Sequence, residues 1–93
     1  MATTTFEAVR AEALFVSYLQ CSQAPKSDEV RAAVVSTLRR VGIKGCAAQV
    51  AGEFGDHPET AVARMAWALA LVRSTYPARR NAPRAVRLLA RSA

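Results

Sequence analysis

The stretch "GEFGDHPETAVARM", residues Gly52–Met65, decides how the chain folds. Pro58 suits the first position of a helix, because its φ is fixed and it has no N–H to leave unpaired. Gly55 stands shortly before it, at a position typical of a helix end. Ala61 and Met65 then recur at a helical spacing of four residues. The stretch therefore predicts two helices joined by a tight turn.

Helical periodicity extends to both sides of this turn, and no strand-like alternation over four or more residues occurs. The expected helices span residues 5–21, 28–41, 46–55, 58–75 and 84–91. We expect an all-α fold, a compact bundle of four or five helices with residues 1–76 as the core domain. Residues 77–93 are expected to form an Arg-rich segment with a short helix docked on that core.

The apolar positions of these helices predict the core. Their spacing predicts burial of the following side chains: Phe6, Val9, Ala13, Val16, Leu19, Val30, Ala33, Val34, Thr37, Leu38, Val41, Cys46, Ala47, Val50, Ala51, Phe54, Val62, Met65, Ala66 and Leu69. Leu14, Phe15 and Tyr18 widen the apolar face of the first helix, which predicts contact with more than one neighbour. Ser27 is expected to cap the second helix, and Arg39 and Arg40 suit the dipole at its end. Gly52 lowers helix stability by about 1 kcal/mol relative to Ala, which predicts that another backbone approaches closely there.

The net charge of +6 is unevenly distributed along the chain. All seven acids lie at or before Glu59, where six Lys and Arg residues leave a net charge of −1. Residues 60–93 contain seven Arg residues and no acid. A segment with a charge of +7 predicts a polyanionic partner. Part of the Arg and Ala content also fits the codon usage of a GC-rich genome.

A helix-turn-helix requires a small residue on its first helix, a turn glycine with positive φ, and apolar positions that orient the second helix. The positions that meet these requirements or follow the associated pattern are Ala51, Gly55, Pro58, Thr60, Ala61 and Met65. On these residues, the segment 46–72 resembles the helix-turn-helix of transposase-type and sigma-factor-like regulators. Over its whole length, the chain resembles small helical proteins of actinobacteria, which implies no mechanism.

The helix-turn-helix resemblance implies a DNA-binding or regulatory protein that holds duplex DNA mainly through phosphate contacts. Thr60 and Arg64 would face the major groove, and phosphate contacts would make the affinity salt-dependent. With the Arg-rich tail included, the residues predicted to bind nucleic acid are Thr60, Arg64, Arg73, Arg79, Arg80, Arg84, Arg87 and Arg91.

Two alternatives stay open. The residues around His57 also suit a plain turn between packed core helices, and Asp56 and Glu59 would repel an approaching phosphate. The other alternative is a protein-interaction module or a homodimer that uses an exposed stripe with Trp67 and Leu71, because Trp is typical of interface anchors. Coverage of Trp67 by another part of the chain is the competing interpretation.

No catalytic function is indicated. The chain has no Gly-rich phosphate loop, no paired-carboxylate motif and no zinc-ligand spacing, and His57 suits a turn. We expect a protein that is not an enzyme and has no cofactor, metal or small-molecule substrate. Without a long apolar run or a signal-peptide pattern, we expect a cytoplasmic protein with no membrane partner. Cys21 and Cys46 are then expected to be reduced thiols, with a redox or disulfide role as the alternative.

Overall fold

The computed structural model describes residues 5–76, which form four α-helices, one 3-10 turn and no strand. The helices are α1 (Thr5–Val16), α2 (Ser27–Val41), α3 (Ile43–Asp56) and α4 (Pro58–Thr75), and the 3-10 turn η2 (Cys21–Gln23) lies between α1 and α2. The predicted all-α class is confirmed. The helix predicted at residues 84–91 lies outside the described residues.

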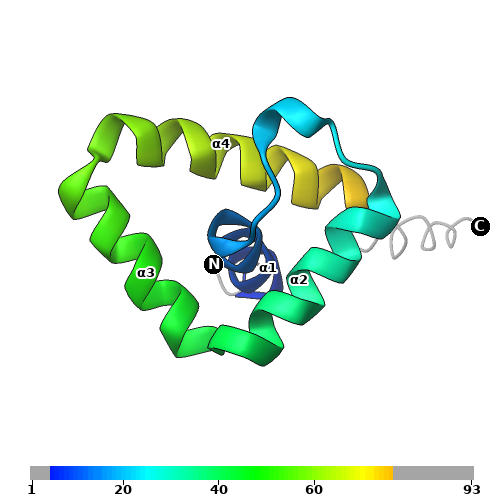
Figure 1. Ribbon diagram of the computed structural model, residues 1–93, viewed down its shortest axis with the longest axis horizontal. Coiled ribbons are helices and arrows are strands. Elements are labelled where there is room, and N and C mark those ends of the chain that lie inside the picture. Colours follow the sequence, from blue (N-terminus) through cyan, green and yellow to red (C-terminus); the bar gives the residue numbers. More distant parts are fainter. Residues whose placement is uncertain (1–4, 77–93) are drawn as a thin grey trace, which may run out of the picture.

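α1 occupies the centre of the molecule, and α2, α3 and α4 form a triangle around it (Figure 1). Each of the three outer helices packs on α1. The main core cluster consists of Ala11, Ala13, Leu14, Val30, Val34, Cys46, Ala68 and Val72. A second cluster, formed by Phe15, Val50 and Ala61, joins α1 to α3 and α4. The central position of α1 explains why its buried residues, Ala11 and residues 13–15, are not confined to one stripe.

α1 ends at Val16, not at residue 21 as the periodicity predicts. Ser17 follows, and its hydroxyl donates a hydrogen bond of 2.6 Å to the carbonyl oxygen of Leu14. Such a side-chain bond competes with the backbone hydrogen bonds of a continuing helix. The chain then leaves the helix axis and reaches α2 through η2.

Several residues predicted to be buried lie at the surface. Phe6 is 74% exposed, Tyr18 is 82% exposed and Val62 is 58% exposed. The remaining exposed positions among the predicted core residues are Ala47, Ala51 and Ala66. On α4 the buried face runs instead through Ala61, Ala68, Val72 and Thr75. The prediction fails there because α4 is apolar on nearly every side, so that its periodicity does not define one face.

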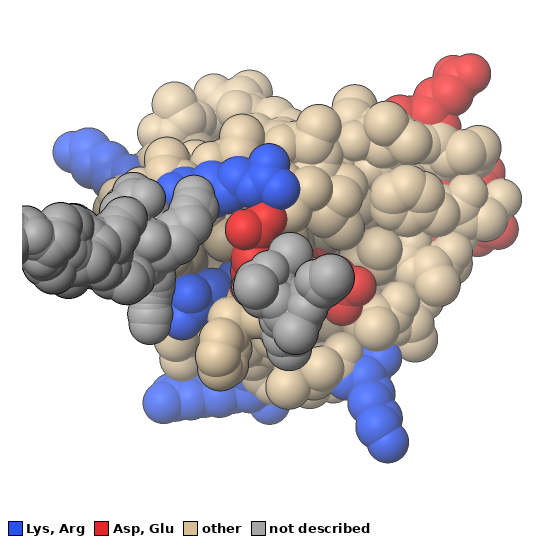
Figure 2. Space-filling view, turned by 180° about the vertical axis from the view of Figure 1, so that it is seen from behind, with Lys and Arg blue, Asp and Glu red and all other residues tan. Residues whose placement is uncertain are grey.

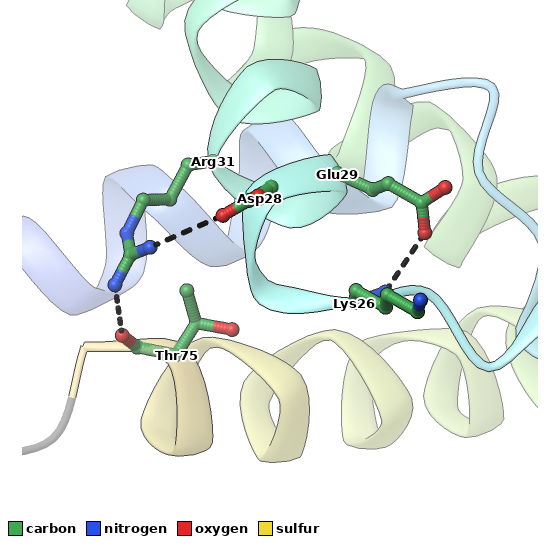
Figure 3. A network of polar contacts seen from close by, with 5 residues as sticks. All are labelled: Lys26, Asp28, Glu29, Arg31 and Thr75. Atoms are coloured by element: carbon green, nitrogen blue, oxygen red, sulfur yellow. Dashed lines mark hydrogen bonds and ion pairs between the residues drawn. The ribbon is translucent and has the colours of Figure 1, made fainter.

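The two ends of α2 follow the helix dipole, although the cap differs from the prediction. Lys26, not Ser27, occupies the N-cap position, and its N–H donates a 2.8 Å hydrogen bond to Glu29 Oε1 (Figure 3). Arg31 Nη2 donates to the carbonyl oxygen of Thr75 at 3.3 Å. Positive charge is favoured at the end of a helix, so this contact stabilises the last turn of α4 against the start of α2.

Candidate functional site at two helix corners

The corner between α3 and α4, which carries the predicted helix-turn-helix, is formed by one residue. His57 lies there with φ −139° and ψ 64°, and Pro58 is the first residue of α4 as predicted. Gly55 belongs to α3, which continues to Asp56, and Gly55 does not have a positive φ. The prediction of a turn glycine at position 55 is therefore wrong, because the chain turns at His57.

The close helix approach predicted for this corner is also absent. Ala51 is exposed, and a Cβ placed on Gly52 or Gly55 would have no neighbouring atom within 4 Å. The predicted close approach at Gly52 is therefore wrong. Ala61, by contrast, is 2% exposed and packs in the second core cluster. The corner is held by this cluster, to which α3 contributes Val50, and not by the small residues Ala51, Gly52 and Gly55.

The α3–α4 corner, which we call the acidic corner, carries the exposed carboxylates of Glu53, Asp56 and Glu59. No Lys or Arg occurs between Lys44 and Arg64 in the chain. Figure 2 shows acidic side chains at the right-hand end of the molecule, which is the end where α3 and α4 meet. A phosphate that approached the first turn of α4 would meet these negative charges.

Arg64, predicted to face the major groove, lies against the end of α1. Its Nε donates to the carbonyl oxygen of Phe15 at 2.8 Å, and its Nη2 donates to those of Ser17 at 3.1 Å and Leu19 at 2.8 Å. The guanidinium also lies over the ring of Trp67, 4.7 Å from its centroid. The last carbonyls of a helix have no partner within the helix. Arg64 therefore caps α1 and attaches it to α4.

Thr60 is exposed and shares with Arg64 a groove of about 260 Å³ beside the end of α1. The groove is also lined by Gln49 and by Glu53 of the acidic corner. A phosphate contact by Arg64 would require its release from the carbonyls that it caps. The nucleic-acid role of Thr60 and Arg64 stays a prediction.

The other predicted nucleic-acid residues are not gathered at this groove. Arg73 Nη2 lies 2.8 Å from Glu7 Oε2, in an ion pair that joins α4 to α1. Arg73 is nine residues beyond Arg64, about 14 Å along a helix axis, so the two do not share one site. The five remaining residues lie outside the described part of the chain: Arg79, Arg80, Arg84, Arg87 and Arg91.

Trp67 and Leu71, predicted as an exposed interface stripe, are both half-buried. Both pack against the main core cluster, and one face of the Trp67 ring is occupied by Arg64. Neither side chain projects freely from α4. A partner that docks on α4 therefore has more access to the outer side of the helix than to this stripe.

The corner between α2 and α3, which we call the basic corner, carries the opposite charge. Gly42 turns the chain alone, with φ 86° and ψ 162°, a conformation open essentially only to glycine. Arg39 and Arg40 lie in the last turn of α2, Lys44 lies in the first turn of α3, and all three are exposed. Residues 30–52 contain no acid.

The start of α3 is open to an anion. The first N–H groups of a helix have no partner within the helix. Among the described residues, no side chain caps those of α3, and its first turn contains no acid. In contrast, α2 has Asp28 and Glu29 in its first turn, and α4 begins with Pro58 and Glu59. Of these three helices, α3 is the one whose first turn contains a positive side chain, that of Lys44, and no acid.

Local packing fixes the basic corner. A Cβ on Gly45 would lie 2.7 Å from Val41 Cγ1, so the Val41 side chain at the end of α2 packs closely against α3 at this glycine. The guanidinium of Arg40 lies 4.7 Å from the ring centroid of Tyr18. Direct contacts thus hold the backbone at Gly45 and the side chain of Arg40.

The remaining chemical groups do not form a site. Both cysteines are free thiols, with Cys21 exposed and Cys46 buried. Burial raises the pKa of the Cys46 thiol, the charge of Glu12 raises it further, and Arg40 acts in the opposite direction. Within residues 5–76, no three His, Cys, Asp or Glu side chains are placed to hold a metal ion, and no helix is long and apolar enough to span a membrane.

No family model, curated protein or solved structure matches this chain. The basic corner is a feature that the sequence pattern does not single out, because Arg39 and Arg40 are explained by the helix dipole and Lys44 falls between the expected helices 28–41 and 46–55. In the structure α3 starts earlier, at Ile43, and includes Lys44. The signal that points to the basic corner is the run of residues 30–52 without an acid. The chemistry of the two corners is therefore the basis for the function proposed below.

Proposed function

We propose that the protein binds the phosphate backbone of nucleic acid, in the first instance duplex DNA, without catalysis. The observation that carries this proposal is the basic corner, where Arg39 and Arg40 end α2 and Lys44 lies in the first turn of α3, all three exposed and close along the chain to the start of α3. Helix N-terminal N–H groups and Arg or Lys side chains are the groups that contact phosphates in protein–DNA complexes. The basic corner offers both kinds of group at one place.

The distribution of charge supports the basic corner as the contact point of the folded part. Residues 5–76 contain eight bases and seven acids, a net charge of only +1, while the segment 77–93 adds five Arg residues. The folded part therefore has no general attraction for a polyanion, and its contribution depends on where its bases gather. The tail supplies additional charge that acts over about a Debye length, roughly 10 Å at moderate salt.

Base reading by α4 has little support. Between Glu59 and Arg73, the polar side chains of α4 are those of Thr60 and Arg64, and Arg64 is bound to carbonyl oxygens. Major-groove recognition depends mainly on Arg, Lys, Asn or Gln side chains that reach base edges. We therefore propose phosphate binding with little sequence preference.

The test is the affinity of the full chain for fluorescent duplexes of unrelated sequence, measured by anisotropy over a salt series. The logarithm of the association constant should fall linearly with that of the salt concentration, and Arg39→Gln and Lys44→Gln should each lower the slope by about 0.9. Lys26→Gln is the matched control, because Lys26 is exposed but precedes Asp28 and Glu29. Lys26→Gln should lower the slope by less than Arg39→Gln or Lys44→Gln.

Two results would contradict the proposal. One is the absence of binding at about 50 mM salt, where phosphate contacts are strong. The other comes from the variant with Asp56→Asn and Glu59→Gln together: if it binds much more tightly while Arg39→Gln has no effect, DNA approaches the acidic corner instead. Each variant is expected to bind the different duplex sequences with equal affinity, because phosphate contacts carry no sequence preference.

A protein-interaction function is the second candidate, and the outer face of α4 favours it. Val62 is 58% exposed there, and Ala63, Ala66 and Ala70 are exposed too. This face differs from the predicted Trp67 and Leu71 stripe, whose side chains are half-buried.

A further inference from the structure

The outer face of α4 is uncovered by the described residues and has no charge along its middle. Val62, Ala63, Ala66 and Ala70 are exposed, and α4 forms one outer side of the triangle in Figure 1. Arg64, the one charged residue between positions 60 and 72, is directed at carbonyl oxygens at and just beyond the end of α1. A surface helix usually carries charged and polar residues on its outer face. This face has the composition of a contact surface.

The two ends of the same face carry opposite charges. Glu59 and Arg73 are both exposed, and each lies seven residues from Ala66. Seven residues are nearly two helical turns, so the three side chains follow one line along α4. The face therefore has a negative end, an apolar middle centred on Ala66, and a positive end.

We propose that this face binds a second copy of the chain, with the two α4 helices antiparallel about a two-fold axis at Ala66. In that register, Glu59 faces the partner's Arg73, and Val62 faces the partner's Ala70. A two-fold contact uses the same patch on both copies, so one charge pair forms at each end. The small side chains let the helix axes approach to about 8 Å.

The contacts of Arg73 are compatible with this arrangement. Its Nε and Nη2 both lie against Glu7 Oε2, at 2.9 Å and 2.8 Å, which leaves Nη1 as a donor. The side chain of Arg73 is 60% exposed. A contact along one helix buries less surface than the roughly 1,200 Å² of a standard interface. The dimer is therefore weak and concentration-dependent, and it does not depend on nucleic-acid binding.

The first test is sedimentation equilibrium of the full chain from micromolar to millimolar concentration. The mass should rise from 10.0 kDa toward twice that value. Ala66→Asp should hold the chain at the monomer mass, because it places two like charges at the axis. Ala48→Asp, at an exposed position on α3, is the matched control and should dimerise like the unmodified chain.

The second test is disulfide linkage in a Cys21→Ser background, which removes the exposed thiol. Because position 66 lies on the axis, Ala66→Cys should form a linked dimer rapidly under mild oxidation, and Ala48→Cys should not. Glu59→Arg should lower the association constant several-fold, with the loss reduced at high salt. A chain that stays monomeric at millimolar concentration and links no faster through position 66 than through position 48 overturns the proposal.

Discussion

The chain turns on a single residue at two corners. Gly42 forms the corner between α2 and α3, and His57 forms the corner between α3 and α4. The α2–α3 corner has a glycine with positive φ, exposed bases on both sides and an uncapped helix start. The α3–α4 corner has exposed acids on both sides, and α4 starts with Pro58, which lacks an N–H. The helix-turn-helix pattern thus lies at the corner with exposed acids, whose charge is less favourable to a polyanion than that of the bases beside Gly42.

Basic residues among those described also differ in their contacts. Arg64 and Arg31 donate to carbonyl oxygens at the ends of α1 and α4, and so contribute to folding. Arg39 and Lys44 are exposed at the basic corner and have no ion pair among the described residues. Charge alone does not separate these two groups, because the separation depends on where helix ends lie in space.

The largest expected effect comes from Arg64→Ala, which should lower the free energy of unfolding by about 3 kcal/mol, because it leaves carbonyl oxygens after α1 without a charged donor. Arg64→Lys should lose most of this stability too, since an ammonium group does not reproduce the planar guanidinium donors. Urea unfolding measures both. Arg39→Ala, the matched variant at the basic corner, should leave stability nearly unchanged and weaken DNA binding. The opposite pattern would reverse the roles assigned to the two arginines.

The next largest effect comes from two glycine substitutions that should change the free energy of unfolding in opposite directions. Gly42→Ala should lower the free energy of unfolding by about 1–3 kcal/mol, because a Cβ is strained at its backbone conformation. Gly52→Ala should raise it by about 1 kcal/mol, because Gly52 is helical and a Cβ there meets open space. Thermal and urea unfolding of both variants provide the comparison. Destabilisation by Gly52→Ala would mean that a neighbouring backbone does approach α3 there.

Much of the fold follows from the sequence, because local signals determine it. Residues Val30, Val34 and Thr37 are buried as their spacing predicts, and Pro58 begins α4. The sequence does not predict which face of α4 is buried. A helix with apolar residues on most sides can bury any of several faces, and its periodicity does not select one. Tertiary contacts with the central α1 select Ala61, Ala68 and Val72.

The candidate site is less accessible to sequence reasoning. The hydrogen bonds of Arg64 connect it to residues that lie more than forty positions earlier, and no local pattern encodes such contacts. The same limit applies to the end of α1, which depends on Ser17 and on that distant arginine. At the basic corner, by contrast, Arg39 and Lys44 are close in the chain. The run of residues 30–52 without an acid is a local signal for the corner, although the helical periodicity does not single it out.

The smallest expected effect concerns the interior beneath the basic corner. Cys46 lies in the first turn of α3, where the helix dipole and the charge of Arg40 ordinarily lower a thiol pKa. Burial dominates instead, and it raises the pKa of Cys46 above the ordinary value of 9.0, with a further contribution from Glu12. The corner is thus positively charged outside and apolar directly underneath.

This pKa shift has a definite consequence for stability. Well below pH 9.0 the thiol is neutral in both the folded and the unfolded state, so its contribution to folding is fully present. Above that pH the unfolded chain loses the proton first, so the free energy of unfolding should decline as pH rises. Urea midpoints between about pH 8 and pH 10 should therefore fall less for Cys46→Ala than for the unmodified chain. In the folded protein, iodoacetamide should modify Cys21 well before Cys46, and equal rates would show that the interior beneath Gly42 is open to solvent.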